Sequence, residues 1–217
     1  MGRNLVFAEN EYYHVYNRGV EKRKIFLDQR DHKRFVWLLY VANSTTPVHL
    51  SNYQGVSLLD MPRGEQIVDI GAWVLMPNHF HLLLKEKQEG GISLFMKKLL
   101  TGYSMYFNIR QHRKGILFEN TFNSKHLDTD NYLAYQYTYI HLNPIGIIDN
   151  GWKQKKIKNL QKALGFLNKY NFSSYKDYLG MKREENMIIN PKAFPEYFKS
   201  ATDFQKMIKE WMDFETE

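Results

Sequence analysis

Residues 76–84, MPNHFHLLL, place two histidines one residue apart inside an apolar run. Side chains of a β-strand alternate between the two faces of the sheet, so His79 and His81 project to one face while Phe80 and Leu82 project to the other. Such a strand predicts a sheet with one face in the core and one face free to bind. Neutral imidazole is a common ligand of divalent metal ions, and two rings on one strand face can share an ion.

The histidine pair could also have a structural role or belong to another class of metal or nucleotide site. Two half-buried polar side chains with satisfied hydrogen bonds would fit equally well. A zincin needs histidines four apart on a helix beside a glutamate, and no pair in the chain has that arrangement. Metallo-β-lactamase-like hydrolases would need Asp and His at Leu82 and Leu83, and histidine-triad nucleotide hydrolases would need a histidine at position 83. A metal here therefore requires a third ligand from elsewhere.

The charge balance favours a polyanionic partner. The 217 residues include 30 Lys and Arg against 23 Asp and Glu, a formal net charge of +7 with a pI near 9.3. The chain has no cysteine, which excludes a disulfide scaffold and a thiolate metal site. No stretch approaches the roughly 20 apolar residues of a membrane span, so we expect no membrane association and a cytoplasmic location. The 15 Tyr and 14 Phe can stack on unpaired bases as well as fill a core.

The hydrophobic periodicity predicts a mixed α+β chain. Residues 11–18 and 67–76 read as strands, and residues 116–127 as a further strand or extended segment. Residues 31–42 and 93–110 carry apolar side chains at helical spacing, with Asp31 and Ser93 as predicted caps. Residues 43–66 read as a loop, with a short strand or hairpin near residues 48–53.

A second informative stretch is residues 128–144, DTDNYLAYQYTYIHLNP. Asp128 or Asp130 can cap a helix that Pro144 ends, and within it Tyr135, Tyr139 and Asn143 fall four apart on one face. Tyr139 and Asn143 are then a candidate nucleophile and metal ligand. The alternative is a tyrosine-rich helix that packs its rings on a sheet, with Asn143 only marking the end of the helix.

The chain resembles the HUH single-tyrosine transposase superfamily, and within it the REP-associated tyrosine transposases and their IS200-like relatives. Four motifs carry the resemblance across roughly residues 10–180: YHVYNRG (13–19), MPNHFHLLL (76–84), YIHLNP (139–144) and SSYKDYLG (173–180). The resemblance implies a ferredoxin-like (RRM-like) antiparallel sheet with helices on one face, plus a C-terminal helical extension.

The resemblance also implies roles for individual residues. His79 and His81 would bind a divalent metal, Tyr139 would be the nucleophile, and Asn143 would be the third ligand where relatives often have glutamine. Imidazoles favour zinc or manganese, but the family uses magnesium or manganese, so the implied ion is Mg or Mn. The implied activity is that of a DNA transposase, a single-strand DNA endonuclease and strand transferase. It leaves a 5′-phosphotyrosine and a free 3′-hydroxyl on single-stranded or hairpin DNA.

We predict a catalytic domain over residues 1–150 and a basic helical extension over residues 151–217, packed on that domain. A homodimer that exchanges the tyrosine helix and a monomer that uses its own tyrosine both remain open. The cations proposed to contact DNA are Arg18, Lys22, Arg23, Lys97, Lys98, Arg110, Arg113, Lys114 and Lys125.

Two other functions fit the same residues. A non-catalytic single-stranded nucleic-acid-binding protein on this fold would bind in a salt-sensitive way without metal-dependent cleavage. A metal hydrolase would turn over a small ester or nucleotide and form no protein–DNA adduct.

Overall fold

The four strands form one antiparallel sheet. The computed structural model describes residues 6–48, 50–53, 55–154 and 156–213. The strands are β1 (Tyr12–Arg18), β2 (Val68–Met76), β3 (His79–Glu86) and β4 (Asn123–His126), in the order β2-β3-β1-β4. With α1 (Gln29–Val41) and α2 (Gly91–Arg110), the chain runs β1-α1-β2-β3-α2-β4, the ferredoxin-like order. The predicted α+β fold is confirmed.

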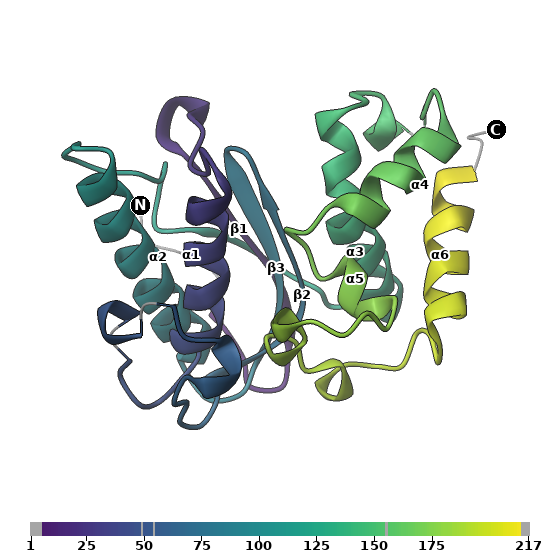
Figure 1. Cartoon of the computed structure of the whole chain (residues 1–217). Coiled ribbons are helices and arrows are strands. Elements are labelled where there is room, and N and C mark those ends of the chain that lie inside the picture. The colour runs from purple at the N-terminus through teal and green to yellow at the C-terminus, as the bar shows by residue number, and fades with distance from the viewer. Residues whose placement is uncertain (1–5, 49, 54, 155, 214–217) are drawn as a thin grey trace.

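Helices α1 and α2 cover one face of the sheet (Figure 1). The apolar side chains that alternate along β1 and β3 point toward them, among them Tyr13, Val15, Phe80 and Leu82, all buried in one cluster with Phe35 of α1. This is the core face that the alternation around the histidines predicts.

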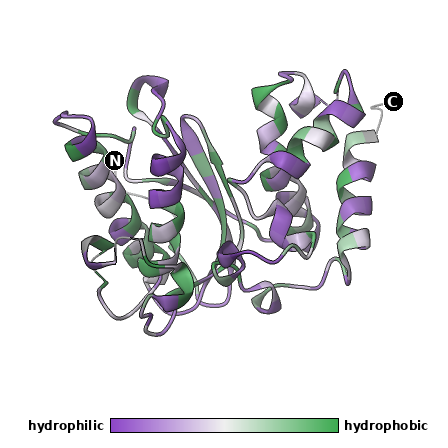
Figure 2. Cartoon of the chain, viewed as in Figure 1, coloured by the Kyte–Doolittle hydropathy of each residue, from purple (hydrophilic) through white to green (hydrophobic). Residues whose placement is uncertain are grey.

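The opposite face carries the tyrosine helix and the extension. Here α3 (Asp130–Leu142) lies against β2 and β3, and beyond it lie α4 (Leu160–Lys169), α5 (Tyr175–Tyr178) and α6 (Ala201–Asp213) (Figure 1). A second buried cluster joins Val74 and Leu83 of the sheet to Tyr137 of α3 and Phe204 of α6. Figure 2 shows both hydrophobic and hydrophilic residues along α6, as expected for a helix with one packed side.

Backbone hydrogen bonds tie the extension to the edge strand. Leu75 N donates to Phe172 O and Ser174 N donates to Trp73 O, each at 2.9 Å. These two bonds connect residues 172–174 to the edge strand β2. The short 3₁₀ turns are η1 (Val20–Lys22), η2 (Leu50–Asn52), η3 (Leu58–Asp60), η4 (Asn143–Ile147), η5 (Trp152–Gln154), η6 (Glu184–Met187) and η7 (Pro191–Ala193). None of the described helices has the length and apolar character needed to cross a membrane.

Two predicted helix starts are wrong by two or three residues. Asp28, not Asp31, caps α1, because its carboxylate accepts the backbone N–H groups of Arg30 and Asp31. Asp31 is instead buried and accepts from Leu27 N. Helix α2 begins at Gly91, after Gly90 adopts a left-handed conformation (φ 74°) that suits a residue without a Cβ.

Other local predictions also need correction. Residues 116–127 form a strand only at Asn123–His126, and residues 50–52 form η2 instead of a strand, while residue 49 lies outside the described part. Thr129, not an aspartate, caps α3. Asn143 keeps a helical backbone (φ −49°, ψ −39°) although Pro144 follows, because the chain continues into η4.

Candidate functional site

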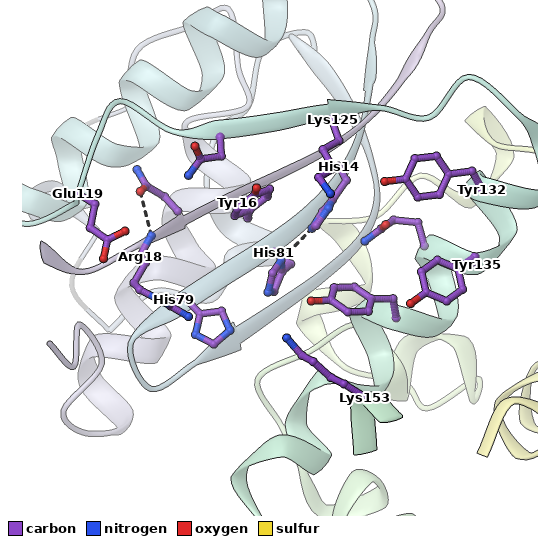
Figure 3. A pocket seen from close by; sticks show the side chains of 14 residues that line it. His14, Tyr16, Arg18, His79, His81, Glu119, Lys125, Tyr132, Tyr135 and Lys153 are labelled. Carbon is purple, nitrogen blue, oxygen red and sulfur yellow. Dashed lines mark hydrogen bonds between the residues drawn. The ribbon is translucent and has the colours of Figure 1, made fainter. Parts of the chain in front are cut away.

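The pairing of β1 with β3 gathers polar side chains on the face opposite α1 and α2. Tyr16 lies across from His81, and Arg18 lies across from His79. Directly opposite residues of an antiparallel pair project to the same face. Both histidines, Tyr16 and Arg18 therefore share the face that α3 covers, together with His14, two residues before Tyr16 on β1 (Figure 3).

Helix α3 completes a cavity of about 410 Å³ over this face. It contributes Tyr132, Tyr135, Gln136 and Tyr139 to the lining. The Tyr139 ring centroid lies 5.6 Å from that of His81. The structure thus brings together the predicted imidazole pair and the predicted nucleophile within one chain.

Hydrogen bonds fix which nitrogen each imidazole presents. Nδ1 of His79 lies 2.7 Å from Oδ1 of Asn78, and because an amide oxygen only accepts, the imidazole donates and leaves Nε2 with a lone pair. Nδ1 of His81 lies 2.8 Å from Nε2 of His14. When His81 donates in that contact, its own Nε2 also carries a lone pair. Partners of this kind commonly orient metal-binding histidines.

The site keeps its imidazoles neutral. Burial, with the charges of Arg18 and Lys153, lowers the pKa of His79 to about 4. Burial and the neighbouring His14 and His79 lower the pKa of His81 well below its ordinary value. Burial and Lys125 lower the pKa of His14 to about 3. Since only the neutral ring can bind a metal, these shifts favour coordination near neutral pH.

The available donors fit a site built on two imidazoles. Among the described residues, no group of three or more His, Cys, Asp or Glu side chains is placed to hold an ion. A third ligand would have to be another type, such as an amide oxygen. Asn143 is buried, but it does not border the cavity, and its Nδ2 donates to Tyr139 O at 2.9 Å. That bond leaves Oδ1 as its only possible ligand atom.

Three cations of the described part of the chain border the cavity. Arg18 and Lys125, both predicted, come from β1 and β4, and Lys153 comes from η5 in the extension (Figure 3). Nζ of Lys153 lies 5.6 Å from the Tyr139 ring centroid. Glu119 lies at the Arg18 end of the cavity (Figure 3). The excess of positive charge suits an anionic ligand such as a phosphate.

The remaining predicted DNA contacts lie elsewhere in the described chain. They are Lys22, Arg23, Lys97, Lys98, Arg110, Arg113 and Lys114, and none of them borders the cavity. Most belong to or follow α2, on the other face of the sheet. Arg110 there forms ion pairs with Asp28 and Asp31, so a DNA contact would compete with an internal role.

Sequence reasoning missed several residues of the cavity. His14 belongs to the same alternating strand as Tyr13 and Val15, on the opposite face, but its hydrogen bond with His81 depends on the register between β1 and β3. Gln136 lies one helical turn before Tyr139, a spacing that could have suggested it. Lys153 falls in a cationic run where no pattern separates one lysine from the next.

No protein-family model and no curated protein matches the chain. Among solved structures, a yeast (Saccharomyces cerevisiae) tRNA(His) guanylyltransferase matches with 12% identity over 92% of this chain and 87% of that chain, but its TM-score of 0.39 supports no argument. A REP-associated tyrosine transposase bound to a REP hairpin matches with a TM-score of 0.51 and 13% identity, over 85% of this chain and 90% of that chain. The chain therefore has a fold similar to that of a REP-associated tyrosine transposase.

Proposed function

We propose that the chain is a metal-dependent single-strand DNA endonuclease and strand transferase with Tyr139 as its nucleophile. One observation carries this proposal: Tyr139, His79 and His81 border one cation-lined cavity. The fold shared with a tyrosine transposase supports it.

The proposed reaction is a transesterification. The phenolic oxygen of Tyr139 attacks the phosphorus of a DNA phosphodiester and loses its proton, while the bond from phosphorus to the 3′ oxygen breaks and that oxygen gains a proton. The products are a 5′-phosphotyrosine and a free 3′-hydroxyl. A 3′-hydroxyl can later attack the phosphotyrosine and reverse the step, so strand joining needs no nucleotide cofactor.

His79 and His81 would hold the Mg or Mn ion. The resemblance implies Asn143 as the third ligand, which would bind through its Oδ1 atom, although Asn143 does not border the cavity in this structure. A bound ion would neutralise charge on the phosphate and orient its oxygens, which makes phosphorus more reactive toward a phenol. Arg18, Lys125 and Lys153 would hold the flanking phosphates.

Aromatic side chains of the cavity suit a single strand. Tyr16, Tyr132 and Tyr135 line it, and Tyr135 is 43% exposed. Exposed tyrosine rings can stack on unpaired bases, which a duplex does not offer. We therefore propose single-stranded or hairpin DNA as the substrate.

The test uses the full chain, Mn²⁺ and hairpin-containing single-stranded oligonucleotides labelled at the 3′ end. A 5′-phosphotyrosine retains the 3′ fragment, so we expect a labelled protein band on a denaturing gel. Tyr139→Phe should abolish the band. Tyr135→Phe, four residues away on the same side of α3, is the matched control and should retain it. An adduct that survives Tyr139→Phe would show that the nucleophile is another residue.

A non-catalytic single-strand-binding protein is the second candidate. The donor set favours it in one respect, because no group of three or more His, Cys, Asp or Glu side chains among the described residues is placed to hold an ion. This candidate predicts salt-sensitive oligonucleotide binding that Mn²⁺ does not convert into an adduct.

A further inference from the structure

A buried amide in the cavity has an unused donor. Gln136 of α3 borders the cavity and is only 2% exposed. Its Nε2 atom is shielded from solvent and makes no hydrogen bond within the described part of the chain. Nearly all buried polar side chains in proteins have a partner, so an exception of this kind needs an explanation.

The surroundings indicate what could satisfy this donor. An N–H group needs an acceptor. Among the described lining residues, the charged groups are three cations, Arg18, Lys125 and Lys153, and one carboxylate, Glu119, so their charge is positive in sum. A site rich in cations and with an unpaired donor is suited to an anion that brings oxygen acceptors. A phosphate group has this chemistry.

The position on the helix connects Gln136 to the proposed reaction. Residues three apart on a helix lie on the same side, so Gln136 and Tyr139 face the cavity together. Figure 3 shows Tyr132 and Tyr135 of the same helix pointing toward the strand carrying His14 and the strand carrying His79 and His81. A phosphate within reach of the Tyr139 hydroxyl would therefore lie beside this helix face.

We propose that the Gln136 amide donates a hydrogen bond to a non-bridging oxygen of the phosphate that Tyr139 attacks. This inference rests on the proposed function. A donor fixed before the reaction stabilises the charge that develops on the phosphate oxygens without reorganising at that moment. Burial strengthens the contact because water does not compete for it.

Two substitutions at Gln136 distinguish a donor to the phosphate from a metal ligand or a structural side chain. Gln136→Met keeps the length of the side chain and removes the amide, whereas Gln136→Glu keeps an acceptor and removes the donor. Gln161→Met, at an exposed position of α4, is the matched control. Each full-length variant is compared with the native chain in three measurements: the single-turnover rate of adduct formation, the Mn²⁺ affinity by electron paramagnetic resonance, and the melting temperature.

We expect Gln136→Met and Gln136→Glu to slow adduct formation by about 10²-fold, the typical loss for one preorganised donor. Mn²⁺ affinity of Gln136→Met should be unchanged. Its melting temperature should not fall, because a methionine leaves no unpaired donor in the cavity wall. Gln161→Met should match the native chain in all three measurements.

Two results would overturn the inference while leaving the proposed function intact. One is a Gln136→Met rate within about threefold of the native rate. The other is a joint loss of rate and Mn²⁺ affinity in Gln136→Met that Gln136→Glu restores, which would make the side chain a metal ligand with its oxygen facing the cavity.

A native chain that forms no adduct would overturn the proposed function instead. The phosphate contact is then judged by non-covalent binding of the same oligonucleotide to Tyr139→Phe and to Tyr139→Phe with Gln136→Met. Loss of a hydrogen bond to a charged acceptor should weaken binding about 10-fold in the double variant. Equal affinities would overturn the inference.

Discussion

At the scale of single residues, the orientation of His81 depends on His14. The two rings share a contact of 2.8 Å between Nδ1 of His81 and Nε2 of His14, and each side chain is 6% exposed. With little space to rotate, His81 presents its other nitrogen to the cavity. His14 is thus a positioning residue for the proposed metal site.

Replacement of His14 should therefore weaken metal binding. His14→Leu removes the partner of His81 Nδ1, and loss of such a partner typically costs about 10–100-fold in metal affinity. A Mn²⁺ titration by electron paramagnetic resonance measures it. His126→Leu on β4 is the matched control, because His126 pairs with Glu11 and does not border the cavity. Native affinity in His14→Leu would contradict the positioning role.

The predictability of the site also differs residue by residue. His79, His81 and Tyr139 could be proposed from the sequence because a strand alternation and a helix with a following proline are local patterns. His14 could not, and for Gln136 the only signal was its spacing from Tyr139, because the roles of both depend on which strands pair and which helix face meets them. The structure supplies that long-range information through the register of β1 with β3 and the packing of α3.

At the scale of elements, an ion pair joins the start of α1 to the end of α2. Arg110 donates to the carboxylate of Asp28, and this contact is the main reason that the pKa of Asp28 is lowered to about 2. A carboxyl group with a lower pKa in the folded state stabilises that state above its unfolded pKa of about 3.9. The contribution is lost as pH falls from that value through about 2.

We expect Asp28→Asn to expose this pH dependence. Asparagine still caps a helix, so the substitution removes mainly the charge. The Asp28 side chain is 46% exposed, and after screening the loss near neutral pH should be about 0.5 kcal/mol in the free energy of unfolding. Urea unfolding of both proteins over a pH series measures the difference, which should shrink toward zero near pH 2. A difference that grows with acidity would contradict this account.

At the scale of the whole molecule, the extension is part of the structure that builds the site. Its Lys153 lies over the Tyr139 ring, and its Trp152 ring lies 5.6 Å from that ring. Its last helix packs into the cluster shared with the sheet and α3. The domain boundary near residue 150 remains a prediction. Residues before and after it pack against each other.

Removal of a buried ring from α6 should destabilise the chain. Phe204 is fully buried among Tyr175, Tyr178 and His141, so Phe204→Ala should cost about 3–5 kcal/mol through lost burial and an unfilled cavity. Leu160→Ala, at a position 37% exposed, should cost far less. Urea denaturation gives both values. Similar small losses in the two variants would contradict tight packing of α6.

The salt dependence of DNA binding can show whether the cations at the cavity or those near α2 contact the DNA. Lys153→Met should weaken binding of single-stranded DNA and reduce the slope of log affinity against log salt by about 0.7, the value for one phosphate contact. Lys114→Met, after α2 on the other face, is the matched control and should leave the slope unchanged. An equal effect of Lys114→Met would place the DNA over α2 instead.

The α+β sheet could be predicted from the sequence, whereas the position of the extension could not. Alternating strands and two amphipathic helices indicate the α+β sheet, since these patterns repeat within a few residues. For residues 151–217 the sequence predicts a basic helical extension but does not indicate which surface its helices contact. In the structure α4 contacts η4 and α5, and its buried Ala163 and Leu167 belong to the same cluster as Val74 and Leu83, which lie far away in the sequence.

The central claim is that Tyr139 forms a bond to DNA, and mass spectrometry of the native chain tests it most directly. After incubation with an oligonucleotide and Mn²⁺, the adduct is digested with nuclease and protease, and the modified peptide is fragmented. We expect a phosphonucleotide on Tyr139 within the α3 peptide. A modification confined to Tyr135 or to a residue outside α3, or an unmodified peptide after full turnover of the oligonucleotide, would contradict it.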